Sequence, residues 1–120
     1  MRFLTLVKYN ENGTPPPQAY LDALAEFNRT ATAAGAMIQC SGLQPSALGS
    51  RLQLSRGIIS TTDGPFTETK EIIGGFAVFD VSSKPEMISW MQRFMELGKH
   101  WSDWNCEVEV REMVEQPKFG

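Results

Sequence analysis

Residues 74–81 of the chain read GGFAVFDV, which predicts a strand with apolar side chains on both of its faces. Successive residues of a strand point to opposite sides. Phe76 and Val78 would therefore face one side, while Ala77 and Phe79 would face the other. A strand of this kind belongs inside a sheet that is covered on both faces.

The N-terminal residues 2–9 (RFLTLVKY) show the same property. Phe3 and Val7 lie on one face of this predicted strand, and Leu4 and Leu6 lie on the other. We therefore expect these two strands to form the middle of one sheet.

A first helix is predicted from residue 18 onward, and Gly35 is well placed to end it in a left-handed conformation. A second helix is predicted after Ser83, which forms a capping box with Glu86, and Gly98 ends it. Each helix carries an apolar stripe at helical spacing. The stripes are Tyr20, Leu24, Phe27 and Ala31 in the first helix, and Met87, Ile88, Met91, Phe94 and Met95 in the second.

Further strands are predicted at residues 37–43 and 106–113, and residues 51–62 predict a hairpin with its turn at Arg56-Gly57. The order of elements predicts an α+β fold, a ferredoxin-like βαββαβ arrangement with an inserted β-hairpin. The length of 120 residues suits one domain, residues 1–120.

In this arrangement both helices cover the same face of the sheet, so the second apolar face needs another cover. A second copy of the chain, packed face to face, would supply it, and we expect a homodimer through the sheet face. The alternative is that the inserted hairpin folds across this face.

Composition and charge exclude several classes of function. The formal net charge is -3 and the 11 Lys and Arg residues are scattered, which disfavours nucleic acid as a partner. No apolar run approaches the roughly 20 residues of a membrane helix, so no membrane partner is expected. The N-terminus does not resemble a signal peptide, so a cytoplasmic location is expected.

Metal and disulfide chemistry are not expected either. Cys40 and Cys106 lack the spacing of a zinc site, and the ferredoxin-like strand order places them at opposite edges of the sheet. Each lies in an apolar run, where a free cysteine usually acts as a small hydrophobe. His100 is the one histidine of the chain, so we expect no metal and no cofactor.

Residues 63–71 (DGPFTETKE) form the most distinctive segment of the chain. Asp63 is placed to bind backbone amides of a turn, and Phe66 can anchor that turn against apolar surface. If the segment is extended, Glu68 and Lys70 share one face, where they could orient a polar substrate or transfer a proton. The alternative is that these charges are simply solvated.

Two further groups are candidates for chemistry. His100, close to Asp103 and two tryptophans, can form an acid–base pair in an aromatic pocket, or it can lie in a loop whose tryptophans cover the edge of the core. Glu109 and Arg111 share one face of the last strand. Arg111 is the leading anchor for a substrate because its guanidinium binds anions with two hydrogen bonds, and the alternative is ordinary cross-strand pairing.

The segment at 63–71, the Gly-Gly-Phe at 74–76, the Val-Glu-Val-Arg at 108–111 and the Ser-Gly-Leu-Gln-Pro at 41–45 closely resemble the DGPF branch of the YCII-related family, over nearly the whole chain. The resemblance implies a ferredoxin-like subunit that forms a dimeric α+β barrel. Relatives in the wider superfamily are small isomerases, lyases or cofactor-free oxygenases that act on cyclic organic compounds. Some relatives carry a histidine of a His–Asp pair in the early helix, where this chain has Tyr20.

The first hypothesis is a small cofactor-free enzyme, similar to an isomerase or lyase, that acts on a small organic compound in a cleft of the dimer. Its acid–base groups would be Asp63, Glu68, Lys70 and His100, and its substrate-binding groups Arg111, Glu109 and Phe66. The second hypothesis is a non-catalytic ligand-sensing or regulatory module. The resemblance links this module to an extracytoplasmic-function sigma factor, because family members are often encoded beside one. The third is that the 63–71 segment serves only the turn and the dimer.

Overall fold

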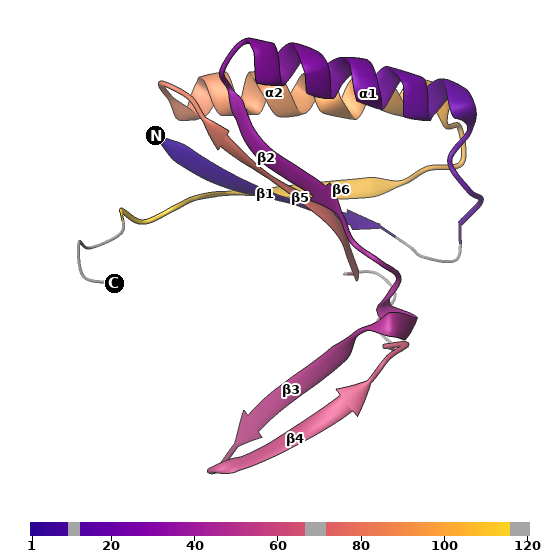
Figure 1. The fold of residues 1–120 in the computed structure, drawn as a ribbon, viewed down its shortest axis with the longest axis vertical. Helices are drawn as coiled ribbons and strands as arrows, with labels where there is room; N and C mark the ends of the chain where they lie inside the picture. Colours follow the sequence, from indigo (N-terminus) through magenta and orange to yellow (C-terminus); the bar gives the residue numbers. More distant parts are fainter. Residues whose placement is uncertain (10–12, 67–71, 116–120) are drawn as a thin grey trace.

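The computed structural model describes residues 1–9, 13–66 and 72–115. A four-stranded antiparallel sheet in the order β2-β5-β1-β6 carries both long helices on one face, and a separate two-stranded hairpin, β3-β4, projects beyond the other (Figure 1). The elements are β1 (Arg2–Tyr9), α1 (Gln18–Ala33), β2 (Met37–Gly42), η1 (Ser46–Leu48), β3 (Ser50–Ser55), β4 (Ile58–Asp63), β5 (Ile72–Asp80), α2 (Lys84–Glu96), η3 (Leu97–His100) and β6 (Cys106–Glu112). The predicted ferredoxin-like α+β fold with an inserted hairpin is confirmed.

The core lies between the helices and the sheet. Phe3 of β1 and Phe79 of β5 face each other in register and are fully buried, together with Met87 of α2. Thr5 is the polar exception in β1, and its hydroxyl donates to the carbonyl oxygen of Ala77 at 3.2 Å. A buried hydroxyl that keeps a hydrogen bond avoids the main cost of its burial.

Helix α1 follows the predicted stripe. Tyr20, Phe27 and Ala31 are buried, and Leu24 packs against the core. The helix ends just before Gly35, whose φ of 74° is the left-handed conformation that glycine adopts at little cost.

Helix α2 begins at the predicted cap, because the Ser83 hydroxyl accepts a hydrogen bond from the amide of Glu86 at 3.2 Å. Glu86 in turn accepts from the amide of Ser82 at 2.7 Å and from its hydroxyl at 2.8 Å. These bonds hold the pKa of Glu86 below its ordinary value.

The predicted stripe of α2 was partly wrong. Trp90 is buried in the core beside Phe27 and Phe79, whereas Ile88 and Met95 are exposed. The stripe is therefore rotated toward Trp90, since the large indole fills the space between the two helices and β5.

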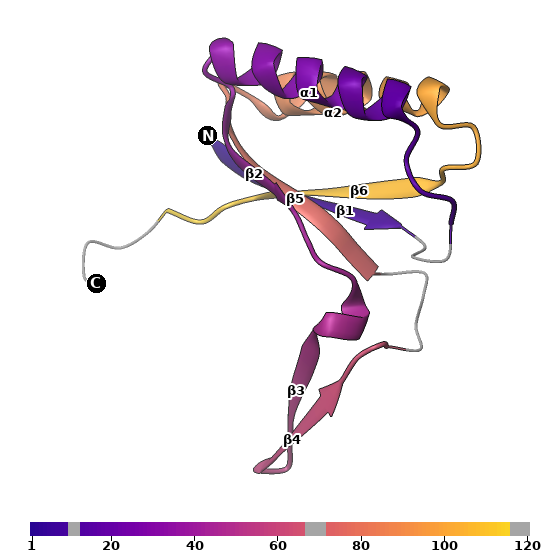
Figure 2. The same cartoon turned by 45° about the vertical axis from the view of Figure 1, so that its right-hand side comes forward.

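The second face of the sheet, called the open face here, carries half-exposed aliphatic and aromatic side chains on the two central strands and charged side chains on β6. Leu4 pairs with Val78 and Leu6 with Phe76 across β1 and β5. The hairpin does not cover them. Every residue of β3 and β4 is exposed, and the hairpin extends away from the sheet (Figure 2). The alternative in which the hairpin folds across this face is therefore wrong.

Within the described ranges, no helix is long and apolar enough to cross a membrane. Cys40 lies on β2 and Cys106 on β6, the two outer strands of the sheet, and both are free, as the strand order predicted. Burial raises the pKa of the Cys106 thiol to about 11, so this thiol stays protonated at neutral pH.

Candidate functional site

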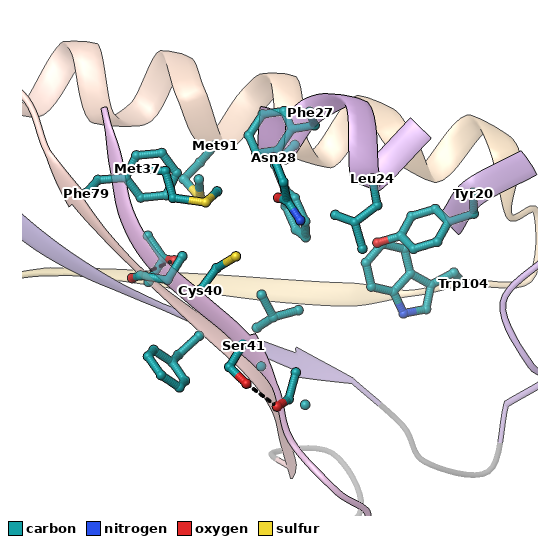
Figure 3. Close-up of a pocket in the computed structure, with 18 residues that line it drawn as sticks. Tyr20, Leu24, Phe27, Asn28, Met37, Cys40, Ser41, Phe79, Met91 and Trp104 are labelled. Carbon is teal, nitrogen blue, oxygen red and sulfur yellow. Dashed lines mark hydrogen bonds between the residues drawn. The ribbon is translucent and has the colours of Figure 1, made fainter. Parts of the chain in front are cut away.

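A cavity of about 210 Å³ lies between α1 and the sheet (Figure 3). Helix α1 forms its roof, and β1, β2 and β5 form its floor. Its lining includes Tyr20, Leu24, Phe27 and Asn28 of α1, Thr5 and Val7 of β1, Met37, Cys40 and Ser41 of β2, Gly75, Ala77 and Phe79 of β5, Met91 and Phe94 of α2, and Trp104.

The cavity exists because the side chains on the covered face of β5 become smaller from one end of the strand to the other. Phe79, Ala77 and Gly75 point to the same side at alternate positions, from a full ring to a methyl group to no side chain. A Cβ added at Gly75 would lie 3.1 Å from the carbonyl oxygen of Ser41, so β2 approaches closely at this point. The space that a larger residue would fill remains open beneath α1.

The polar groups at the cavity are all uncharged among the described residues that line it. They are the Tyr20 phenol, the Asn28 amide, the Thr5 and Ser41 hydroxyls and the Cys40 thiol. Burial, reinforced by the nearby Cys106, raises the pKa of Tyr20 above its ordinary value, so the phenol is a neutral group at physiological pH. Figure 3 shows its oxygen pointing from α1 into the space above the sheet.

One end of the cavity is closed by a cluster of three aromatic rings. Trp104 lies edge-on to Tyr20 with ring centroids 5.0 Å apart, and Trp101 stacks on Trp104 at 4.9 Å. The indole nitrogen of Trp101 donates to the Thr14 hydroxyl at 3.2 Å. That of Trp104 is buried without a hydrogen-bond partner in the part of the chain that the structure describes.

These tryptophans follow the alternative prediction, because they cover the edge of the core rather than surround His100. His100 ends η3 and is exposed, as is Asp103. Neither residue lines the cavity. The acid–base role of His100 stays a prediction.

The described part of the 63–71 segment lies at the base of the hairpin. Asp63 ends β4 and accepts a hydrogen bond from the Ser50 hydroxyl at 2.9 Å. The guanidinium of Arg51 lies over the ring of Phe66, 4.2 Å from its centroid, and both side chains line a separate hollow of about 580 Å³. Glu68 and Lys70 lie outside the described residues.

Glu109 and Arg111 lie on the open face, on the side of the sheet opposite the cavity. The Lys8 ammonium donates to Glu109 at 2.9 Å, and the Arg111 guanidinium donates to it at 3.1 Å. These two hydrogen bonds hold the pKa of the Glu109 carboxyl below its ordinary value. The observed arrangement is the cross-strand and neighbouring ion pairing of the alternative prediction, and the substrate-binding role of Arg111, Glu109 and Phe66 stays a prediction.

None of the predicted site residues that the structure describes lines the cavity. Tyr20 and Cys40, which do line it, were predicted as core residues. Cys40 is exposed rather than buried. Two features of the sequence could have indicated this cavity. One is a phenol at the end of an apolar stripe, and the other is the pair of small residues Gly75 and Ala77 in a strand that otherwise carries large ones.

No group of three or more His, Cys, Asp or Glu side chains within residues 1–9, 13–66 and 72–115 could hold a metal ion.

The sheet order and the helices on one face define a ferredoxin-like α+β protein with a cavity beneath α1. The chain belongs to the family of the YCII-related domain, which it matches over residues 1–113.

Among solved structures, the chain is similar to 5-chloro-2-hydroxyhydroquinone dehydrochlorinase (TftG) from Burkholderia phenoliruptrix AC1100, in complex with 2,5-dihydroxybenzoquinone. The TM-score is 0.51 and the sequence identity 17%, over 97% of this chain and 96% of that one, so the likeness shows the shared fold. The comparison with curated proteins found no match.

Proposed function

We propose that this protein binds a small, uncharged cyclic organic compound in the cavity beneath α1. The observation that carries the proposal is a cavity of about 210 Å³ whose described lining is apolar apart from neutral polar groups. An apolar protein cavity of about 150 Å³ is large enough for benzene. The larger volume here suits a six-membered ring with one or two small substituents.

The lining also selects the charge of the ligand. An anion moved from water into an apolar cavity without a cationic partner pays a large desolvation cost. Since the described lining offers no such partner, a neutral phenol or cyclic ketone should bind better than a carboxylate of the same size.

Tyr20 and Asn28 supply the orientation. The neutral phenol of Tyr20 can donate to a carbonyl or hydroxyl oxygen of the ring, and the Asn28 amide can donate or accept. The similar dehydrochlorinase structure holds an oxygen-substituted six-membered ring, which is of a size that this cavity can take.

The second candidate is a cofactor-free enzyme of the isomerase or lyase type, and the Cys40 thiol at the cavity favours it, because a thiol can act as a nucleophile once ionised. In this proposal Asp63, Glu68, Lys70 and His100 keep the acid–base roles that the sequence predicts. Without turnover, the binding site would serve a cytoplasmic sensing module, such as one linked to an extracytoplasmic-function sigma factor.

A ligand series tests the binding proposal. Phenol, cyclohexenone and benzoate would be titrated against the protein by calorimetry and thermal shift, since a bound ligand raises the apparent stability. We expect the two neutral compounds to bind and benzoate to bind at least about tenfold more weakly. Equal affinity for benzoate would contradict the proposed site.

Two variants locate the ligand. Ala77→Leu fills the cavity from the sheet and should abolish binding, whereas Val78→Leu, on the opposite face of the same strand, should leave it unchanged. Chromatography coupled to mass spectrometry of the incubated ligands then separates the two candidates, because it resolves isomers of equal mass as well as cleaved products, whereas a sensor returns the ligand unchanged.

We also propose that two copies form a homodimer through their open faces, as a dimeric α+β barrel of the DGPF branch. The half-exposed apolar side chains of β1 and β5 support this proposal, because a face of this kind is stabilised by a partner that removes it from water. Leu6→Glu, in the middle of the open face, should convert the dimer to a monomer in analytical ultracentrifugation.

A further inference from the structure

The hairpin β3-β4 is amphipathic, although no other described part of the chain covers it. Its register pairs Leu54 with Ile59 and Leu52 with Thr61, and partners across an antiparallel pair point to the same side. Leu52, Leu54 and Ile59 therefore form one apolar side, called the arm face here. The other side carries Arg51, Gln53, Ser55, Ile58, Ser60 and Thr62.

The three side chains of the arm face are unusually exposed. Leu52 is 67%, Leu54 72% and Ile59 69% exposed. The hairpin pairs with no strand of the four-stranded sheet. A two-stranded hairpin alone is marginally stable in water, so a cover over this side would stabilise it.

The dimensions of the chain lead to the same conclusion. Its radius of gyration is 16.4 Å, whereas a compact chain of this length has about 14 Å. The hairpin, which reaches away from the sheet like an arm in both views (Figures 1 and 2), contributes to this difference.

The direction of the arm restricts its occupant. The helices lie on one side of the sheet, and the hairpin extends on the other side, which is the side of the open face (Figure 2). A body that packs on the open face therefore also meets the hairpin. One partner can thus cover both apolar surfaces of the molecule.

The charges fit a second copy of this chain. The hairpin carries Arg51 and Arg56, with no acidic residue before Asp63 at its end. Strand β6 is an edge strand beside the open face and places Glu107 and Glu109 on that face, where Glu109 pairs with Lys8 and Arg111, whereas Glu112 lies on the other face. Two copies in a face-to-face dimer can each bring a basic arm toward Glu107 of the other, and two-fold symmetry makes the contact twice.

We propose that the hairpin is an intersubunit arm that packs Leu52, Leu54 and Ile59 against a second copy of the chain. This proposal depends on the homodimer proposed above. It extends that proposal, because the hairpin holds the partner in addition to the sheet.

Two adjacent isoleucines make a matched test. Ile58 and Ile59 are 71% and 69% exposed, and they point to opposite sides of the hairpin. The dimer dissociation constants of Ile58→Ser and Ile59→Ser would be measured by sedimentation equilibrium, with circular dichroism as a check on folding. We expect Ile59→Ser to raise the constant about tenfold or more, and Ile58→Ser to change it less than about threefold.

A charge-reversal variant gives a second test of the arm. Arg56 occupies the turn at the tip of the arm, with a φ of 50°. Arg56→Glu should weaken the dimer several-fold at low salt and much less at 1 M salt, where interactions between charges are screened beyond about 3 Å.

The outcomes separate the arm from the dimer. If the wild type is a dimer and Ile59→Ser is as tight as Ile58→Ser, the arm is overturned and the dimer stands. If the wild type is a monomer at every concentration, both are overturned. If Ile59→Ser weakens only the binding of a different protein and leaves the dimer unchanged, the occupant is that protein, and our assignment of a second copy is wrong.

Discussion

Strand β5 and the hairpin strands β3 and β4 all carry large apolar side chains, but these side chains lie in opposite environments. Phe79 of β5 is fully buried between the sheet and the helices, whereas Leu54 of β3 is 72% exposed. Strand β5 has a partner on each side, and each hairpin strand has one. A run of residues that favour strands thus specifies a strand, and the connections and neighbours decide whether its apolar side chains are covered within the same chain.

We expect the largest effect on the free energy of unfolding from the buried residue of this comparison, Phe79. Phe79→Ala removes a fully buried ring and should lower the free energy of unfolding by about 3–5 kcal/mol, measured by urea denaturation. Val78→Ala, one residue away on the open face, should cost much less at the same protein concentration. Equal losses would mean that the two faces of β5 are equally buried in solution.

The next effect lies where the hairpin joins the body. A Cβ at Gly64 would lie 1.7 Å from the carbonyl oxygen of Ser46, so Gly64→Ala must displace backbone and should cost about 1–3 kcal/mol in urea denaturation. Gly98 is the matched control, because a Cβ there meets nothing within 4 Å. If Gly98→Ala were as destabilising as Gly64→Ala, the close approach at the base of the hairpin would not be the cause.

The ion pairs of the open face predict a pH effect. The pKa of Glu109 is lowered in the folded state by its hydrogen bonds to Lys8 and Arg111, so its contribution to stability is present above the unfolded pKa of about 4.3. That contribution is lost as the pH falls through the lower, folded pKa. The melting temperature of the wild type should therefore fall more steeply below pH 4.3 than that of Glu109→Gln, and parallel curves would contradict this prediction.

The smallest effect should come from the arm face itself. In dilute solution, where sedimentation shows only monomer, Leu52→Ala should change the free energy of unfolding by no more than about 0.5 kcal/mol, because the side chain is 67% exposed. A loss of several kcal/mol in the monomer would mean that the hairpin packs on its own chain.

The sequence predicts the fold well because strands and helices depend on local periodicity. The β1, β5 and β6 patterns and the turn at Gly57 define a sheet and a hairpin before any contact is known. Trp90 was missed because its position in the stripe depends on how the two helices pack, which local spacing does not specify.

The candidate site was harder to predict than the fold, because a cavity forms where side chains are small or missing. Gly75 and Ala77 leave a space that becomes visible only when α1 is placed above them. Charged residues such as Asp63 and Arg111 attract attention in a sequence, yet the described ones lie at the hairpin base and on the open face. The residues that line the cavity look like ordinary core.

The base of the hairpin has an evolutionary consequence. The amide of Gly64 donates to the carbonyl oxygen of Gly49 at 2.9 Å, and Ser50 pairs with Asp63 directly above, so the two strands leave the body side by side. Residue pairs can therefore be added or lost at the Arg56-Gly57 tip without moving the strands that frame the cavity. Natural selection can lengthen or shorten the hairpin, and with it the proposed contact between copies, while the strands that line the cavity are inherited unchanged.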